Sequence, residues 1–199
     1  MKKIVYIIPG FKGSARKKNY RKVIGYFKEK GFKVEEVSID WKKQSMSSFV
    51  NQFLKIKPAK GSYVFGFSYG AMIAVISARK IKPGMLILCS LSPYFSEDIG
   101  RTKAVYGKRL DKYHSKKLLD GFKKYRFNRI AKSIECKTLL LAGDKETIIR
   151  GKNRHLVLNR AKDAKSRIRN SRLIIVRNGK HNIAGKEYDA ALRKVINRL

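Results

Sequence analysis

The stretch that decides how this sequence folds is Gly66-Phe67-Ser68-Tyr69-Gly70. It follows the apolar run Tyr63-Val64-Phe65 and leads into a stretch, up to Ala78, that is rich in alanine, isoleucine and valine. The five residues fit the pattern Gly-x-Ser-x-Gly, in which a serine occupies a sharp turn between a strand and a helix. Larger side chains in place of the two glycines would collide with the neighbouring strand and helix. The sequence therefore predicts a strand, a strained turn at Ser68 and a helix.

Strands and helices are expected to alternate on both sides of this turn. The apolar runs predict strands at residues 3–8, 32–39, 62–67, 85–89, 137–142 and 173–176. The amphipathic stretches predict helices at residues 16–30, 47–57, 69–80, 152–165 and 184–198. Continuous apolar strands that alternate with helices are typical of a parallel sheet covered on both faces. We predict an α/β fold, a three-layer α/β/α sandwich with a mostly parallel sheet of about six strands.

One stretch, at about 91–134, interrupts this alternation. It contains no clear strand, and its aromatic residues lie among many lysines and arginines: Tyr94, Phe95, Tyr106, Tyr113, Phe122, Tyr125 and Phe127. The 199 residues suit one domain with a substantial core. We therefore expect a single domain over residues 1–199 with a helical insert. The aromatic residues either form the insert's own core or shape a substrate pocket.

The charge of the chain is unusual, because 48 Lys and Arg residues stand against 14 Asp and Glu residues, a formal net charge of +34. Such a charge attracts nucleic acids, anionic membranes and anionic substrates. The cations are spread along the whole chain, so a solvated basic surface without a specific partner explains them equally well. Net charge bears on association and not on the fold.

Membrane, export and metal signals are weak in this sequence. No apolar run reaches the roughly 18–20 residues of a membrane span, and the run at residues 4–8 is too short for the apolar core of a signal peptide. We therefore expect a cytoplasmic protein. Cys89 and Cys136 lie in apolar runs without a nearby histidine, so buried free thiols are expected rather than a zinc site.

A serine hydroxyl becomes a good nucleophile only when a base takes its proton. His181 follows the last predicted strand, at the edge of the sheet where Ser68 is also expected, whereas His114 and His155 are expected on the surface. The base needs an acid to orient it. Asp144 and Glu146 follow the strand predicted at 137–142, and either would fit.

An oxyanion hole requires backbone N–H groups that point at the developing negative charge. The first strand ends in Ile8-Pro9-Gly10-Phe11-Lys12-Gly13-Ser14, and this turn can present the N–H of Phe11. The turn after Ser68 can present the N–H of Tyr69. The spacing Gly10-x-x-Gly13 is only a weak signal for phosphate binding, because neither nucleotide-binding glycine pattern is complete.

With these residues in place, the chain resembles the α/β-hydrolase family over nearly its full length. The family's oxyanion turn commonly reads His-Gly-hydrophobic, and here it reads Pro9-Gly10-Phe11. The family's acid usually lies three residues after a strand-ending glycine, which makes Glu146 the acid and Asp144 the alternative. The family's histidine follows a glycine turn, as His181 does in Gly179-Lys180-His181. The resemblance implies a sheet that lacks the family's first two strands, with the insert in the place of the lid.

The resemblance implies a serine hydrolase without a metal or organic cofactor. Ser68 would attack a carboxylic ester with His181 as base and Glu146 as its acid, and the N–H groups of Phe11 and Tyr69 would bind the oxyanion. An amidase, a peptidase or an acyltransferase would use the same residues. In a further alternative, the chain is a basic protein that binds nucleic acid or an anionic surface without catalysis. The charge could also select anionic substrates.

Overall fold

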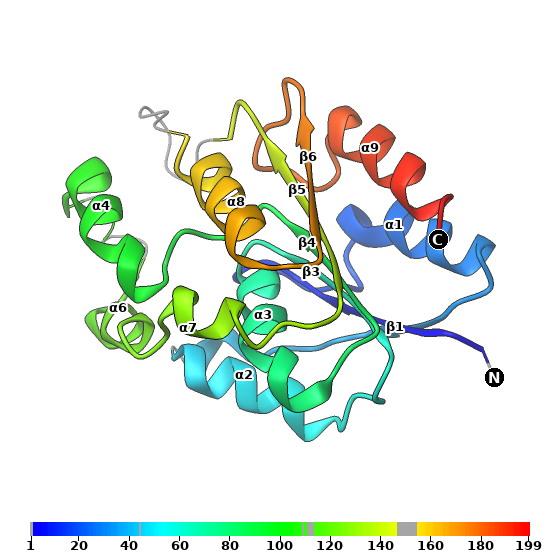
Figure 1. Ribbon diagram of the computed structural model, residues 1–199, viewed down its shortest axis with the longest axis horizontal. Helices are drawn as coiled ribbons and strands as arrows, with labels where there is room; N and C mark the ends of the chain where they lie inside the picture. The colour runs from blue at the N-terminus through cyan, green and yellow to red at the C-terminus, as the bar shows by residue number, and fades with distance from the viewer. Residues whose placement is uncertain (1, 44, 109, 111–113, 147–154) are drawn as a thin grey trace.

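Six strands form one sheet in the computed structural model, which describes residues 2–43, 45–108, 110, 114–146 and 155–199. The strands are β1 (Ile4–Ile8), β2 (Lys33–Glu36), β3 (Tyr63–Phe67), β4 (Met85–Cys89), β5 (Lys137–Gly143) and β6 (Ser171–Val176). Their order across the sheet is β2-β1-β3-β4-β5-β6, and every neighbouring pair is parallel. The prediction of a largely parallel α/β fold is confirmed (Figure 1).

The helices that cover the sheet begin and end close to the predicted positions. They are α1 (Arg21–Glu29), α2 (Met46–Lys55), α3 (Tyr69–Ile81), α8 (Leu156–Arg167) and α9 (Lys186–Ile196). The helix predicted at 16–30 starts later, because residues 18–20 form a 3₁₀ turn. The helix predicted at 152–165 begins at Leu156, and residues 152–154 lie outside the described residues. Within the described residues, no helix has the length and apolar content that a membrane crossing requires.

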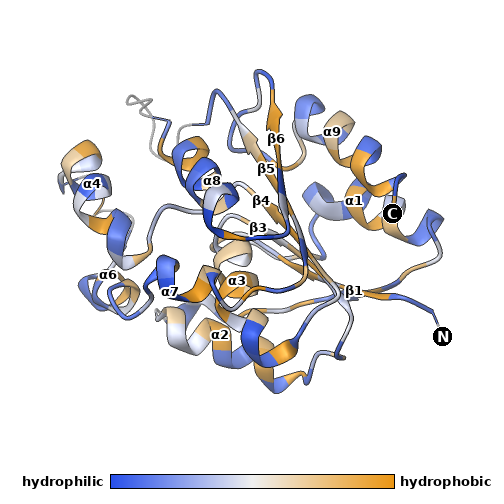
Figure 2. Ribbon diagram, viewed as in Figure 1, coloured by the Kyte–Doolittle hydropathy of each residue, from blue (hydrophilic) through white to orange (hydrophobic). Residues whose placement is uncertain are grey.

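The two faces of the sheet are covered by different helices, and β1 shows how its sequence directs this. Val5 and Ile7 pack on one face with α1 and α9, whereas Tyr6 and Ile8 pack on the other with α2 and α3. Successive side chains of a strand point to opposite faces, so a continuous apolar run buries both. Figure 2 shows the apolar strands enclosed between helices whose outer surfaces are polar. The α/β/α layers therefore follow from the apolar runs.

In the described part of the insert between β4 and β5, the helices are α4 (Ser96–Tyr106), α6 (Lys116–Phe122) and α7 (Phe127–Ala131). They gather at one end of the molecule and contact α2, α3 and α8 (Figure 1). Five aromatic side chains of the insert are buried: Tyr94, Phe95, Tyr106, Phe122 and Phe127. These five residues belong to the same core cluster as residues of α2 and α3, and Tyr94 and Phe122 pack against the ring of Tyr69, with 5.5 and 5.6 Å between ring centroids. Tyr113 lies outside the described residues.

The side-chain carboxylate of Glu97, on α4, caps the N-terminus of α7. Glu97 accepts hydrogen bonds from the backbone N–H groups of Phe127 (3.0 Å) and Asn128 (3.1 Å), the first two residues of α7. Helix N-termini leave such N–H groups without partners inside the helix. Burial alone would raise the pKa of Glu97, but hydrogen bonds from its own backbone N–H, from the N–H groups of Asn128 and Phe127 and from the Ser96 hydroxyl together hold that pKa below the usual value of 4.5.

Replacing Glu97 with glutamine should therefore lower stability in a pH-dependent way. A carboxyl group whose pKa is lowered in the folded state stabilises the fold above its unfolded pKa, and this contribution is lost as the pH falls through the folded pKa. We expect Glu97→Gln to reduce the free energy of unfolding by about 0.5 kcal/mol at pH 7, a small effect because the Glu97 side chain is exposed, and the difference to be smaller at pH 3, below the usual pKa of 4.5. Urea unfolding at both pH values measures it, and an equal difference at both would contradict this account.

Candidate active site

Ser68 occupies a strained turn between β3 and α3. Its backbone angles are φ 56° and ψ −115°, a conformation that residues with side chains rarely adopt. A Cβ on Gly66 would lie 2.5 Å from the backbone of Gly70, and a Cβ on Gly70 would lie 2.1 Å from the carbonyl oxygen of Ile8. Both glycines of the Gly-x-Ser-x-Gly pattern are therefore required by close backbone contacts. The turn holds the serine at the carboxyl end of β3.

The structure brings His181 to Ser68 across 113 residues of sequence. Its Nε2 atom lies 3.1 Å from the Ser68 Oγ atom, within hydrogen-bond distance. The imidazole packs against the ring of Phe67, with 5.0 Å between ring centroids, and about 20% of its side chain is exposed. His181 lies in the loop between β6 and α9. It is therefore fixed on one side and accessible to a substrate on the other.

Glu146 contacts the other nitrogen of the same imidazole. Its Oε2 atom lies 2.6 Å from His181 Nδ1, and its side chain is buried. The second carboxylate oxygen, Oε1, accepts hydrogen bonds from the Gly143 N–H (2.7 Å), the Ser90 hydroxyl (2.9 Å) and the Tyr188 hydroxyl. Three donors on one oxygen compensate for the burial of a carboxylate. They also leave Oε2 directed at His181.

The alternative acid, Asp144, has a different environment. Its backbone N–H donates to Val176, and its Oδ1 atom is buried without a hydrogen-bond partner in the structure. Neither oxygen of Asp144 contacts His181 among the hydrogen bonds of the described residues. The structure therefore places Glu146, and not Asp144, beside the histidine.

Three residues of this network could not be identified from the sequence. Ser90 and Ser92 follow β4, and Tyr188 lies on α9 in what reads as an apolar stripe. Ser92 is buried, and its Oγ atom lies 3.0 Å from Ser68 Oγ. Burial and then the charge of Glu146 raise the pKa of the Tyr188 phenol well above its usual value, so the phenol stays protonated and can donate.

The expected oxyanion residues lie against Ser68. A Cβ built on Gly10 would lie 3.4 Å from the Ser68 Cβ atom, and the rings of Phe11 and Tyr69 lie 4.9 Å apart. The turn after β1 is closed by a hydrogen bond from the Gly13 N–H to the Gly10 carbonyl oxygen (2.8 Å). Within the described part of the chain, the N–H groups of Phe11 and Tyr69 have no hydrogen-bond acceptor. Both are therefore available to a ligand beside Ser68.

The prediction that His114 lies on the surface is wrong. His114 is buried, and its ring lies 5.0 Å from Tyr94, 5.9 Å from Tyr69 and 6.0 Å from Phe11. Its neighbours in sequence are basic and polar, which suggested exposure, but its aromatic partners come from distant segments. His155, by contrast, is exposed.

The two cysteines take no part in this arrangement. Cys89 and Cys136 are free thiols, Cys89 buried and Cys136 partly exposed. Burial raises the pKa of the Cys89 thiol well above its usual value, which keeps it protonated. Over the described residues, no group of three or more His, Cys, Asp or Glu side chains is arranged to hold a metal ion.

No family model and no curated protein sequence matches this chain. Solved structures do match it. Est1E from Butyrivibrio proteoclasticus superposes with a TM-score of 0.81 at 15% identity, over 99% of this chain and 86% of that chain. MGS-MChE2, an alpha/beta hydrolase enzyme from the metagenome of sediments of the Mar Chica lagoon in Morocco, gives 0.71 at 18% identity, over 100% and 90%. This chain has the α/β-hydrolase fold.

The α/β-hydrolase fold accommodates different chemistries. A bromoperoxidase from Bacillus anthracis also superposes, with a TM-score of 0.68 at 17% identity, over 100% of this chain and 93% of that chain. The fold therefore fixes where the site lies, and the chemistry has to be argued from the residues there. In enzymes of this fold the order along the chain is nucleophile, acid, histidine, and the three hydrogen-bonded residues of this chain occur in the order Ser68, Glu146, His181.

Proposed function

We propose that this protein is a serine hydrolase that cleaves carboxylic esters through an acyl-enzyme intermediate. The observation that carries the proposal is the continuous hydrogen-bonded chain from Ser68 through His181 to Glu146 on the strained turn. A nucleophile, a base and an orienting acid in this geometry are the requirements for nucleophilic acyl transfer.

In the first half of the reaction, the Ser68 Oγ atom attacks the ester carbonyl carbon while His181 Nε2 takes the serine proton. The carbonyl oxygen becomes an oxyanion, which the N–H groups of Phe11 and Tyr69 stabilise. The imidazolium of His181 is stabilised by Glu146 at Nδ1. His181 then protonates the leaving alcohol as the carbon–oxygen bond breaks, and an acyl group remains on Ser68.

In the second half, His181 takes a proton from a water molecule, and the resulting nucleophile attacks the acyl carbonyl carbon. The bond between the acyl carbon and Ser68 Oγ breaks, and Ser68 recovers its proton from His181. The carboxylic acid product leaves. Every proton transfer in both halves uses Nε2 of the same histidine, and no metal or organic cofactor takes part.

The choice of an ester over an amide rests on the structural neighbours. One structure of Est1E has ferulic acid bound, and EaEST from Exiguobacterium antarcticum is an esterase, each superposing over 98% of this chain. An amidase, a peptidase or an acyltransferase would use the same three residues and differ in the pocket. We propose a small acyl substrate, and the net charge favours anionic ones.

The test combines a covalent probe with an ester panel. A fluorophosphonate probe should form one adduct, mapped by peptide mass spectrometry to Ser68, and p-nitrophenyl esters of short acids should be hydrolysed with a burst of p-nitrophenol. Matching p-nitroanilides should turn over more slowly. An adduct without ester turnover would indicate an amidase or an acyltransferase, and the absence of any adduct between pH 6 and pH 9 would contradict the proposal.

Ser92 is expected to hold the Ser68 hydroxyl in its reactive orientation. A hydrogen bond donated by Ser92 to Ser68 Oγ leaves the proton of Ser68 free to point at His181. Ser92→Ala removes one hydrogen bond, worth about 1 kcal/mol, so we expect kcat to fall by about five- to tenfold. The rate of fluorophosphonate labelling should fall by a similar factor while the melting temperature stays within a few degrees. Unchanged labelling would show that Ser92 plays no positioning role.

A further inference from the structure

The edge of the sheet where the strands begin carries a repeat that the candidate active site does not use. The tetrapeptide Lys-Ile-Lys-Pro occurs twice, at residues 55–58 and 80–83. The first copy ends α2 and leads toward β3, and the second ends α3 and leads toward β4. Because β3 and β4 are parallel neighbours, the two copies meet at one edge of the sheet. Ser68 lies at the opposite edge.

The two loops are fixed to each other through their backbones. The Gly61 N–H donates to the Lys82 carbonyl oxygen (3.0 Å), and the Gly84 N–H donates to the Ser62 carbonyl oxygen (2.9 Å). A Cβ on Gly84 would lie 2.5 Å from the Gly61 carbonyl oxygen, so the loops approach as closely as glycine permits. The backbone segments that carry the lysines of both copies are therefore held in a fixed position relative to each other.

Two of these lysines occupy positions that favour glycine. Lys57 has φ 51° and Lys82 has φ 46°, both in the left-handed region that follows many helices. A residue with a side chain costs about 1–2 kcal/mol there relative to an ordinary conformation. In both copies the chain places a cation where glycine would be more stable. Backbone strain of this kind is a reason to look for a function.

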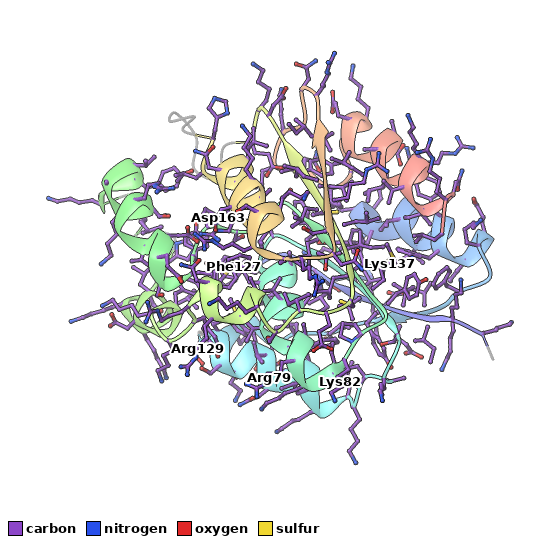
Figure 3. All side chains as sticks on the ribbon, viewed as in Figure 1. Arg79, Lys82, Phe127, Arg129, Lys137 and Asp163 are labelled. Atoms are coloured by element: carbon purple, nitrogen blue, oxygen red, sulfur yellow. The ribbon has the colours of Figure 1, made fainter. Side chains whose placement is uncertain are left out.

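The surface around the repeat is strongly basic and contains grooves. Nine exposed cationic side chains and one acid, Glu135, occur in residues 54–62, 78–84 and 129–137; the cations are Lys55, Lys57, Lys60, Arg79, Lys80, Lys82, Arg129, Lys132 and Lys137. We call this surface the lysine edge. Figure 3 shows Arg79 and Lys82 at the end of α3, with Arg129 on the neighbouring helix α7.

Two grooves run across the lysine edge. The smaller, of about 240 Å³, is lined by lysines of both copies, Lys57, Lys80 and Lys82, together with Lys60. The larger, of about 730 Å³, lies between the second copy and the segment before β5, with Arg79 among its lining residues. In the described part of the chain, none of these five cations forms a salt bridge. Their charges are therefore available to an external anion.

We propose that the lysine edge binds the phosphate backbone of nucleic acids. Unpaired cations along a groove track a chain of phosphates, and binding of this kind is independent of sequence. None of the residues that line the two grooves is aromatic, so contacts to phosphates rather than base stacking are expected. A flat membrane surface fits this edge less well, because stable membrane binding also needs inserted apolar groups. Ile56, 48% exposed, is the one large apolar side chain of the described lysine edge that is exposed.

A variant that removes four lysines without straining the loops tests the proposal. In K57G/K60Q/K80Q/K82G, glycine replaces lysine at the two left-handed positions, where it is the preferred residue. The matched control, K17Q/K28Q/K186Q/K194Q, makes the same change of net charge at four exposed lysines associated with α1 and α9, on the other face of the sheet. Fluorescence anisotropy with a 20-nucleotide single strand, between 50 and 300 mM salt, measures both.

We expect the lysine-edge variant to lower the slope of log affinity against log salt by about 3, since each lost phosphate contact on a single strand removes about 0.7. Affinity at 100 mM salt should fall at least tenfold, and the control should change both quantities by less than half as much. Equal losses in the two variants would overturn the proposal in favour of net charge alone. Binding of phosphatidylserine vesicles with no binding of the oligonucleotide would assign the edge to membranes and would also overturn it.

The proposal is independent of the catalytic one, because Ser68 and the lysine edge lie at opposite edges of the sheet. Circular dichroism and fluorophosphonate labelling of Ser68 check that each variant is folded. If the fourfold variant were destabilised, K57G/K82G alone should be at least as stable as wild type and still lower the slope by about 1.4. An unchanged slope in that folded variant would contradict the proposal.

Discussion

Replacing Ser68 with alanine is expected to lower kcat for ester hydrolysis by at least about 10⁴-fold. Alanine removes the nucleophile, and the remaining groups can only bind the substrate and polarise its carbonyl. Any residual rate would come from water attack assisted by His181 and the N–H groups of Phe11 and Tyr69. Fluorophosphonate labelling should disappear completely, because the probe reacts with the serine oxygen itself. Steady-state kinetics with p-nitrophenyl acetate and intact mass after labelling measure the two effects.

Ser77, in the helix that follows Ser68, provides a matched control. It is fully buried in α3, and its hydroxyl has no hydrogen-bond partner in the structure. Ser77→Ala should keep kcat within about twofold, since an unpartnered buried hydroxyl contributes little to the native fold. If Ser68→Ala kept more than one tenth of the wild-type kcat, or if Ser77→Ala lost labelling, the nucleophile would have to be assigned elsewhere.

The turn at Ser68 could be predicted from sequence because its requirements are local. Gly66 and Gly70 lie within four residues of each other, and each is needed for a backbone contact that any side chain would prevent. The sheet could be predicted because its strands are continuous apolar runs, which a parallel sheet buries on both faces. His181 and the pair Asp144 and Glu146 followed from the same logic, since all three lie just after strands whose carboxyl ends share one edge. The choice of Glu146 over Asp144 came only from the resemblance to the α/β-hydrolase family.

The residues that support Glu146 and Ser68 could not be predicted, because nothing local distinguishes them. Ser90 and Ser92 are ordinary serines in a loop, and the spacing of Tyr188 on α9 indicates a core residue. Their roles arise only when β4, β5 and α9 are brought together. The prediction for His114 was wrong for a related reason. Its neighbours in sequence indicated an exposed side chain, but aromatic rings from distant segments bury it.

The Lys-Ile-Lys-Pro repeat of the lysine edge is a third case of what sequence does and does not predict. Both copies of Lys-Ile-Lys-Pro are visible in the sequence, yet they start 25 positions apart. They become one surface only because each follows a helix that precedes one of two neighbouring strands, β3 and β4. The crossover geometry of a parallel sheet thus converts a sequence repeat into a pair of adjacent loops.

The second large effect is expected from Glu146→Gln, a change of one atom. The Oε1 atom of Glu146 faces three donors, so the amide of glutamine must place its carbonyl oxygen there and its NH₂ group toward His181. The Nδ1 atom of His181 then becomes an acceptor, and the proton of the neutral imidazole moves to Nε2. A protonated Nε2 cannot take the proton of Ser68. We therefore expect kcat to fall by about 10³–10⁴-fold, as for the corresponding change in a serine protease triad.

Two readouts separate this tautomer effect from simple loss of structure. The ¹⁵N chemical shifts of the imidazole should show the proton on Nδ1 in the wild type and on Nε2 in Glu146→Gln at pH 8, with the near-ultraviolet circular dichroism unchanged. Asp144→Asn is the matched control and should keep kcat within about threefold, because neither Asp144 oxygen contacts the histidine. A large loss in Asp144→Asn together with full activity in Glu146→Gln would reverse the assignment of the acid. Of Asp144 and Glu146, Glu146 has both an oxygen on Nδ1 and three donors on its other oxygen, so the geometry favours a large loss of kcat in Glu146→Gln and a small one in Asp144→Asn.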